Sequence, residues 1–232
     1  MMKLSLIIPC FNEESNIKKL VNKINYIAPK LGECEIILVN NGSKDNTYNK
    51  LINETKKFSY FKVIDIKKNN GYGNGIYQGI IKSSGDIVAW THADLQTDPE
   101  DIVTGYNLIK NKDKKTIIKG KRKNRSKLDV IFTYLMSKIV NIFSNSNLND
   151  INAQPKFFYR NFLEYIDNPP KDFNLDLYIL IKASRIGYKI IDFPVYFHKR
   201  NFGIAKGGGS IKGKIKLSYK TFLYILIKSN KI

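Results

Sequence analysis

Three residues of one short segment carry side chains that suit a divalent metal ion. His92, Asp94 and Gln96 alternate along residues 92–96, directly after an apolar run. In an extended backbone, residues two positions apart point to the same side, so we expect Asp94 and Gln96 to present their oxygen atoms together. Carboxylate and amide oxygens suit Mg²⁺ and Mn²⁺, and a neutral imidazole can also bind Mn²⁺. The pattern predicts a Mg²⁺ or Mn²⁺ site with Asp94 as a direct ligand.

Three other polar or glycine-rich segments also follow apolar, strand-like runs. They are Pro9-Cys10-Phe11-Asn12-Glu13, Asn40-Asn41-Gly42-Ser43-Lys44-Asp45 and Gly71-Tyr72-Gly73. The strand-like runs are short and apolar, as in buried parallel strands, and cover residues 3–9, 35–40, 61–66 and 86–91. Ligands of open parallel sheets bind beyond the carboxyl ends of the strands, so all four segments are expected to meet at one edge.

Helices are predicted between these strands. Ile17, Leu20, Val21, Ile24 and Ile27 recur at helical spacing behind an acidic pair. A second helix is expected up to residue 55, with a side-chain cap near residue 43 or 45, and another begins at residues 98–101. The alternation predicts an α/β fold with a mostly parallel central sheet and helices on both faces.

In this order and at these spacings, the segments resemble the family 2 glycosyltransferases, which have the GT-A fold. Within that family the chain is similar to the dolichol-phosphate mannose synthase type, whose members use polyprenyl phosphates. The matching segments are residues 6–14, 39–47, 70–75 with Gly79, 84–88, 92–99 and 200–206. The resemblance implies an inverting, metal-dependent transferase with a UDP- or GDP-linked sugar as donor.

The resemblance also implies a role for individual positions. The nucleotide-binding candidates are Pro9, Phe11, Asn12, Glu13, Asn40, Asn41, Gly71, Gly73 and Ala93. The metal candidates are Asp94, Gln96 and His92, and the candidates for phosphate or acceptor binding are Arg122, Arg200 and Lys206. A departing diphosphate gains negative charge, which a Lewis-acid metal ion and cationic side chains neutralise.

The chain departs from the family pattern in two of these segments. His92 stands where the family has Asp, and Asn40 and Asn41 stand where it has one or two acids. Fewer negative charges predict weaker binding of a hard cation. An Asn side chain both donates and accepts, so it can still pair with the edge of a uracil or a guanine. A nucleotide-sugar-binding protein that has lost catalysis is the rival hypothesis.

The acceptor decides whether a catalytic base is needed. A hydroxyl must lose its proton to a base, whereas a phosphate is already ionised. Asp176 and Asp150 are the candidate bases, with a helix-start role and a turn role as their respective alternatives. The basic segment 119–127 favours a polyprenyl phosphate. A hydroxyl of a lipid-linked or surface glycan is the alternative acceptor.

The charge balance indicates an anionic partner. The chain has 39 Lys and Arg against 20 Asp and Glu, a formal charge of +19. The basic residues are dispersed rather than grouped with aromatic residues, which argues against nucleic acid. Two segments, 128–143 and 215–227, combine apolar helical faces with lysines. That pattern is typical of helices on an anionic membrane surface, although packing on the sheet is the alternative.

The length and composition fit one folded domain. We expect a catalytic domain over residues 1–210, with residues 207–210 as a mobile lid or a linker, and a basic amphipathic helix over 211–232. No segment reaches the ~20 apolar residues of a membrane span, and the first residues suit a strand better than a signal peptide. These features predict a cytoplasmic protein, peripheral at the inner face of the cell membrane, and are compatible with a homodimer.

Overall fold

The computed structural model describes residues 2–198 and 210–228 of the 232-residue chain. The strands are β1 (Leu4–Cys10), β2 (Cys34–Asn41), β3 (Phe61–Ile66), β4 (Ile87–Trp90), β5 (Thr116–Lys123), β6 (Lys156–Tyr159) and β7 (Lys189–Tyr196). The helices are α1 (Glu14–Leu31), α2 (Thr47–Thr55), α3 (Tyr72–Ile81), α4 (Glu100–Lys110), α5 (Lys127–Ser144), α6 (Leu175–Arg185) and α7 (Ile211–Lys228), with a 3₁₀ turn η1 (Arg160–Tyr165) before α6.

The strands form one sheet in the order β3-β2-β1-β4-β6-β5-β7. The first four strands in this order, β3, β2, β1 and β4, are parallel to one another. β1 lies between β2 and β4, with Ile7 opposite Ile37 and Trp90. β6 runs antiparallel to both β4 and β5, while β5 and β7 are parallel. The four predicted strands are confirmed within one residue at each end, and so is the mostly parallel sheet. The antiparallel strand β6 was not anticipated by the sequence pattern.

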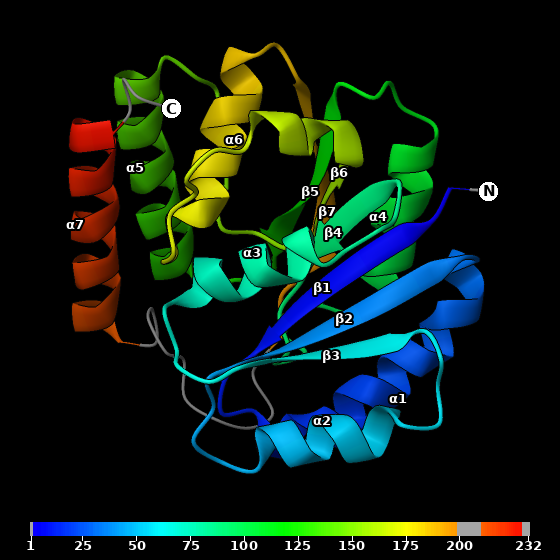
Figure 1. Ribbon diagram of the computed structural model, residues 1–232. Helices are drawn as coiled ribbons and strands as arrows, with labels where there is room; N and C mark the ends of the chain where they lie inside the picture. Colours follow the sequence, from blue (N-terminus) through cyan, green and yellow to red (C-terminus); the bar gives the residue numbers. More distant parts are fainter. Residues whose placement is uncertain (1, 199–209, 229–232) are drawn as a thin grey trace.

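Helices cover both faces of the sheet, as predicted (Figure 1). One face packs against α1, α2 and α4, where Leu6 and Ile8 of β1 meet Ile17 of α1. The other face packs against α3 and α6, where Ile7 meets Ile76. Alternate residues of β1 therefore serve two separate cores, which explains why the strand is apolar throughout.

Two acidic residues mark helix starts, as the sequence indicates. A carboxylate oxygen of Asp45 accepts the backbone N–H of Thr47 at 3.1 Å, and one of Asp98 accepts that of Glu100 at 3.0 Å. Ser43, the other candidate cap, accepts the backbone N–H of Asn12 instead. Each of these contacts satisfies backbone donors that a helix or loop start leaves open.

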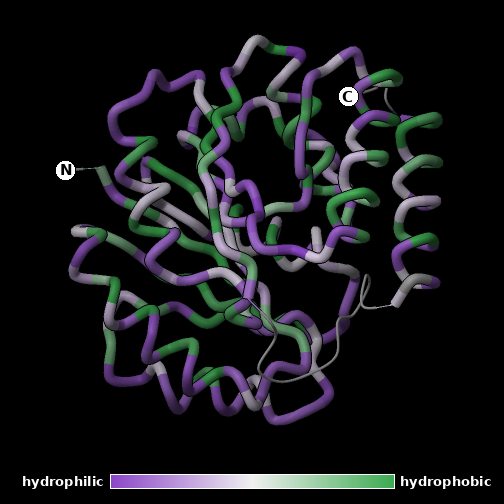
Figure 2. Tube along the Cα trace, turned by 180° about the vertical axis from the view of Figure 1, so that it is seen from behind, coloured by the Kyte–Doolittle hydropathy of each residue, from purple (hydrophilic) through white to green (hydrophobic). Residues whose placement is uncertain are grey.

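Helices α5 and α7 lie side by side at the margin of the molecule, where apolar residues recur along both (Figures 1 and 2). Phe143 packs edge-on against Phe222 at 5.8 Å between ring centroids, and Lys214 forms an ion pair with Asp129. Both predicted helices are therefore present. None of the helices in the described part of the chain combines the length and the apolar character needed to cross a bilayer.

Candidate active site

A cavity of about 670 Å³ opens beyond the carboxyl ends of β1, β2 and β4 and continues to α5, α6 and α7. It brings together ten of the predicted site residues that precede α5. These are Pro9, Phe11, Glu13, Asn41, Gly71, His92, Ala93, Asp94, Gln96 and Arg122. Asp176 lines the same cavity from the first turn of α6. The expected convergence of four strand-end segments at one edge is thus observed.

Asn12 and Asn40, two of the predicted nucleotide contacts, do not line this cavity. Asn12, at a φ of 52°, accepts the backbone N–H of Lys44 through its side chain at 2.8 Å. The Asn40 amide donates to Asp65 at 2.7 Å and accepts the N–H of Ser43 at 3.3 Å. Both side chains therefore help to hold the loops after β1 and β2 in place.

Asn41 and Gly71 are placed together at the cavity wall. The Asn41 amide donates to the carbonyl of Gly71 at 3.0 Å, while its oxygen has no hydrogen-bond partner within the described residues. Gly71 has a φ of 109°, and a Cβ there would lie 2.3 Å from the carbonyl oxygen of Lys171. Gly73, another predicted nucleotide contact, does not line the cavity. A Cβ on Gly73 would lie 2.4 Å from the Pro170 oxygen, so it permits close packing of the chain before α6.

Asp94 and Gln96 face the cavity through a turn rather than the predicted extended loop. Leu95 between them has a φ of 56°, in the left-handed region. Asp94 is 7% exposed and accepts the backbone N–H of Gln96 at 3.1 Å. The Gln96 amide donates to the His198 carbonyl at 3.1 Å, which ties this turn to the end of β7. The two side chains still reach one cavity, as expected.

His92 belongs to a stack of three aromatic rings inside the cavity. Its ring stacks on Tyr72 at 5.8 Å between centroids, and Tyr72 stacks on Phe173 at 4.9 Å. Burial, reinforced by the charge of Asp176, raises the pKa of Tyr72 well above its usual range. The phenol is therefore neutral, and the stack fixes the plane of the His92 ring.

The residues of this wall fit a divalent metal ion that is coordinated partly by the protein and partly by a phosphate of the substrate. Within residues 2–198 and 210–228, no group of three or more His, Cys, Asp or Glu could hold a metal alone. Mg²⁺ is usually bound by one or two carboxylates together with substrate phosphates and water. Asp94, with the Gln96 amide and the His92 imidazole beside it, supplies such a partial set of donors.

Asp176 is held by three donors at the floor of the cavity. One of its carboxylate oxygens accepts from Lys156 at 2.6 Å, Gln154 at 2.8 Å and Trp90 at 3.2 Å. Asp176 is 2% exposed and the Lys156 side chain is fully buried. Asp176 does begin a helix, but its side chain bonds other elements rather than the helix amides.

Asp150, one of the two predicted bases, pairs with two arginines. It accepts the backbone N–H of Arg122 at 2.8 Å and the guanidinium Nε at 3.0 Å, and Arg125 lies 3.7 Å away. Burial alone would raise the pKa of Asp150, but hydrogen bonds from Arg122 and its charge lower it. Asp150 does not line the cavity, whereas both arginines do.

Several functional residues were missed or lie elsewhere. Lys214 of α7 and Asn174 before α6 line the cavity without any sequence signal that singled them out. Lys119 of the basic segment is fully buried against Asp192 at 2.8 Å, so it is not part of an acceptor surface. The predicted contacts Arg200 and Lys206, and the glycines 207–209, lie outside the described residues.

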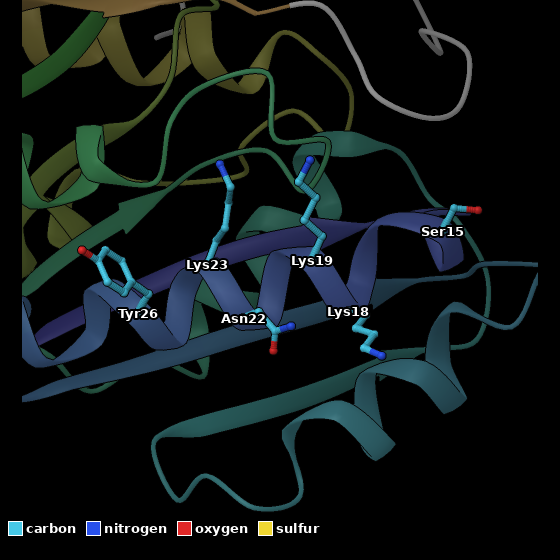
Figure 3. Close-up of a pocket in the computed structure, with 6 residues that line it drawn as sticks. All are labelled: Ser15, Lys18, Lys19, Asn22, Lys23 and Tyr26. Atoms are coloured by element: carbon cyan, nitrogen blue, oxygen red, sulfur yellow. The ribbon is translucent and has the colours of Figure 1, made fainter.

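A second depression, of about 510 Å³, lies on the outer side of α1 (Figure 3). Its lining residues are Ser15, Lys18, Lys19, Asn22, Lys23 and Tyr26. It shares none of them with the strand-end cavity; Lys18 and Lys19 are exposed and Lys23 is half-buried. This surface carries part of the positive charge but offers no catalytic group.

Comparisons with known proteins agree with the sequence resemblance. Residues 5–149 match the model of glycosyl transferase family 2. A dolichol-phosphate mannosyltransferase of Pyrococcus furiosus is 29% identical over 98% of this chain, which spans 64% of that relative's length. A glucosyl-3-phosphoglycerate synthase of Mycobacterium tuberculosis, solved with Mn²⁺, UDP and glucosyl-3-phosphoglycerate, superposes with a TM-score of 0.78 at 15% identity, covering 100% of this chain and 81% of that one. A further mycobacterial protein gives a TM-score of 0.79 at 16% identity, covering 100% and 76%. The family model spans more than half of the chain, so this protein belongs to glycosyl transferase family 2, as the strand-end segments predict.

Proposed function

We propose that this protein transfers a sugar from a nucleotide-diphosphate sugar to a polyprenyl phosphate, with Mg²⁺ or Mn²⁺, at an anionic membrane surface. One observation carries the proposal. A single cavity joins Asn41 and Asp94 at the strand ends to Arg122 and Arg125, and then to an apolar groove between α5 and α7. The donor, the anionic group of the acceptor and its lipid chain would thus bind in adjacent parts of one cavity.

The donor end suits a nucleotide diphosphate. Asn41 offers an amide oxygen without a partner among the described residues, and the side chains of Pro9 and Phe11 add an apolar wall. A metal ion at Asp94, Gln96 and His92 would neutralise the leaving diphosphate as a Lewis acid. The Mycobacterium tuberculosis neighbours were solved with UDP and with Mn²⁺ or Mg²⁺, which supports this choice of ligands.

The acceptor end suits a phosphate. Arg122, Arg125 and Lys214 line the cavity together, and a guanidinium matches a phosphate in a bidentate way. A phosphate oxygen would attack the anomeric carbon as the bond to the diphosphate breaks, and no proton has to move. Asp176, already paired with Lys156, is then not required as a base. The name of the Pyrococcus furiosus relative supports a polyprenyl phosphate acceptor.

The groove beyond the arginines suits a hydrocarbon chain. Phe132, Met136 and Val140 of α5, Leu217 of α7 and Ile151 line this part of the cavity. These apolar side chains are continuous with the basic group at Arg122 and Arg125. If the phosphate binds at the arginines, its lipid chain would therefore lie between α5 and α7. We accordingly propose that α7 is part of the catalytic domain rather than a separate segment.

The outer faces of α5 and α7 support membrane attachment. Leu128, Ile131 and Leu135 of α5 are each more than half exposed, as are Ile215 and Ile227 of α7. Most of the predicted apolar face of α5 is therefore not packed on the sheet. Exposed apolar patches of this kind mark membrane or protein contacts, and flanking lysines favour acidic lipids. We propose that this exposed apolar face binds an anionic bilayer, because the chain has a formal net charge of +19.

Product analysis tests the transferase activity. The whole protein is incubated with a panel of UDP- and GDP-sugars and a short-chain polyprenyl phosphate, with Mg²⁺ or Mn²⁺, and products are identified by mass spectrometry. We expect a polyprenyl-phosphate sugar, and Arg122→Ala should raise the KM for the acceptor at least about tenfold. Lys121→Ala, a matched charge loss on the exposed side of β5, should not. Transfer to hydroxyl acceptors alone would instead refute a phosphate acceptor.

Vesicle flotation tests the membrane surface separately. The protein should float with phosphatidylglycerol vesicles and not with phosphatidylcholine vesicles. Replacing Leu128, Ile131 and Leu135 by Ser should abolish flotation, whereas Tyr48→Ser with Ile52→Ser, exposed apolar residues of α2, should leave it intact. Unchanged flotation of the α5 variant, or dimers in light scattering that this variant disrupts, would assign the face to another partner.

A further inference from the structure

The floor of the cavity contains a buried ion pair that the transfer step does not use. Lys156 is fully buried, and its Nζ lies 2.6 Å from Asp176 and 2.8 Å from the carbonyl of Ala153. Its ammonium also lies 5.7 Å from the centre of the Trp90 ring. A buried lysine is costly unless it is paired, so this side chain calls for an explanation.

Asp176 creates an electrostatic problem for the proposed ligands. It lines a cavity that would receive a nucleoside diphosphate and a phosphate, both anionic. An uncompensated carboxylate in this place would repel both ligands, and repulsion is stronger in a buried site than in water. Three donors converge on one oxygen of Asp176, but only Lys156 among them brings a positive charge.

We propose that Lys156 is a positioning residue that cancels the charge of Asp176 and thereby allows an anionic donor to bind beside it. The inference rests on the proposed nucleotide-sugar donor. Lys156 does not touch the cavity itself, so it acts through Asp176, which it holds at the cavity floor together with Gln154 and Trp90.

The surroundings of Lys156 make this compensation sensitive to pH. Burial lowers the pKa of Lys156 to about 8, although the charge of Asp176 acts the other way, and Lys119 lowers it further while Asp150 raises it. Tyr72 is a further ionisable group nearby among the described residues; it shares Gln154 with Asp176, and its pKa is raised. Below pH 8 the ammonium is charged and Asp176 is paired. Above pH 8 the pair becomes net negative and should oppose the donor.

The test is calorimetry of UDP and of GDP with Mg²⁺, using the whole protein between pH 6.5 and 9.5. Affinity of the nucleotide that binds should fall above pH 8, by up to about tenfold per pH unit because one proton is linked to binding. At pH 8 in buffers of different ionisation enthalpy, binding should take up a fraction of a proton. These measurements need no variant, so folding of a mutant does not limit them.

Variants separate charge compensation from a structural role. Lys156→Met should weaken binding at pH 7 at least about tenfold, and adding Asp176→Asn to it should restore most of the affinity and remove the alkaline loss. Lys62→Met, which breaks the ion pair of Lys62 with buried Glu35 away from the cavity, is the matched control and should change neither.

Each outcome decides between the claims. Binding that is independent of pH above 8, or a double variant as weak as Lys156→Met, overturns the role of Lys156 while leaving the donor class intact. Failure of both nucleotides to bind the wild-type protein at pH 7 refutes the donor class and this inference with it.

Discussion

Replacement of Asp150 by Asn distinguishes an arginine-holding residue from a catalytic base. Asp150 is 8% exposed and has a φ of 40°, a conformation that Asn tolerates better than most residues, so the backbone should persist. The amide would place a donor against the Arg122 guanidinium. It would also leave Arg122 and Arg125, whose side chains are 15% and 12% exposed, without their shared counter-charge.

The expected cost follows from these contacts. Removing one partner of a buried ion pair costs about 3–5 kcal/mol, and the partial exposure of both arginines places this case near 3 kcal/mol. For a domain of this size each kcal/mol lowers Tm by about 2–4 °C, so Asp150→Asn should melt roughly 6–12 °C lower. Asp113→Asn changes a surface turn carboxylate in the same way and should have little effect.

The pH dependence of this difference has a definite sign. The folded-state pKa of Asp150 is lowered, so its contribution to stability is complete above the unfolded pKa of about 3.9 and disappears as pH falls through the folded value. Thermal melts of wild type and variant should therefore begin to converge as pH falls below about 4 and should meet only below the lowered pKa of Asp150. In kinetics, the variant should raise the KM for a phosphate acceptor more than it lowers kcat. An unchanged Tm with a large loss of kcat alone would restore Asp150 as a base.

Three further substitutions test the donor end and the chain packing. Asp94→Ala should weaken Mn²⁺-dependent UDP binding by at least about tenfold in calorimetry, and full activity of this variant would refute the metal assignment. His92→Asp adds a hard carboxylate and should tighten Mg²⁺ binding in the presence of UDP; an unchanged affinity would place His92 outside the metal site. Gly73→Ala puts a Cβ 2.4 Å from the Pro170 oxygen and should cost about 1–3 kcal/mol in urea unfolding, whereas an unaltered midpoint would mean that the segment moves freely.

The sequence predicted those features that depend on local pattern and strand direction. Apolar runs located β1 to β4, and because parallel strands end at one edge, Asn41, Gly71 and Asp94 could be placed near one another before the structure. What the pattern cannot give is the direction of a polar side chain within its loop. Asn40 and Asn41 are adjacent and chemically identical, yet one bonds Asp65 and the other faces the cavity.

The sequence also could not predict which lysines are buried and which carboxylates they pair with. Lys119 and Lys156 stand in strands where every neighbouring position is apolar or basic, and lysine is almost never fully buried unless it is paired. Their partners, Asp192 and Asp176, are distant in sequence, so only the tertiary structure reveals the pairing. The stacking of the His92 ring on Tyr72 likewise could not be predicted from the sequence, because the two residues are brought together only by the fold.

The charges along the cavity are arranged in an order that fits one direction of transfer. Glu13 and Asp94 line the strand-end part of the cavity, whereas Arg122, Arg125 and the ion pair of Lys214 with Asp129 line the part formed by β5, α5 and α7. A metal–diphosphate unit is attracted to the acidic end, where the metal charge is compensated, whereas a bare phosphate is repelled from it and attracted to the basic end. Asp176 lies on the floor between these groups, and its pairing with Lys156 leaves that region close to neutral. If the acceptor is a phosphate, as we propose, this arrangement would favour its binding at the arginines and the binding of the metal–diphosphate unit at the strand ends.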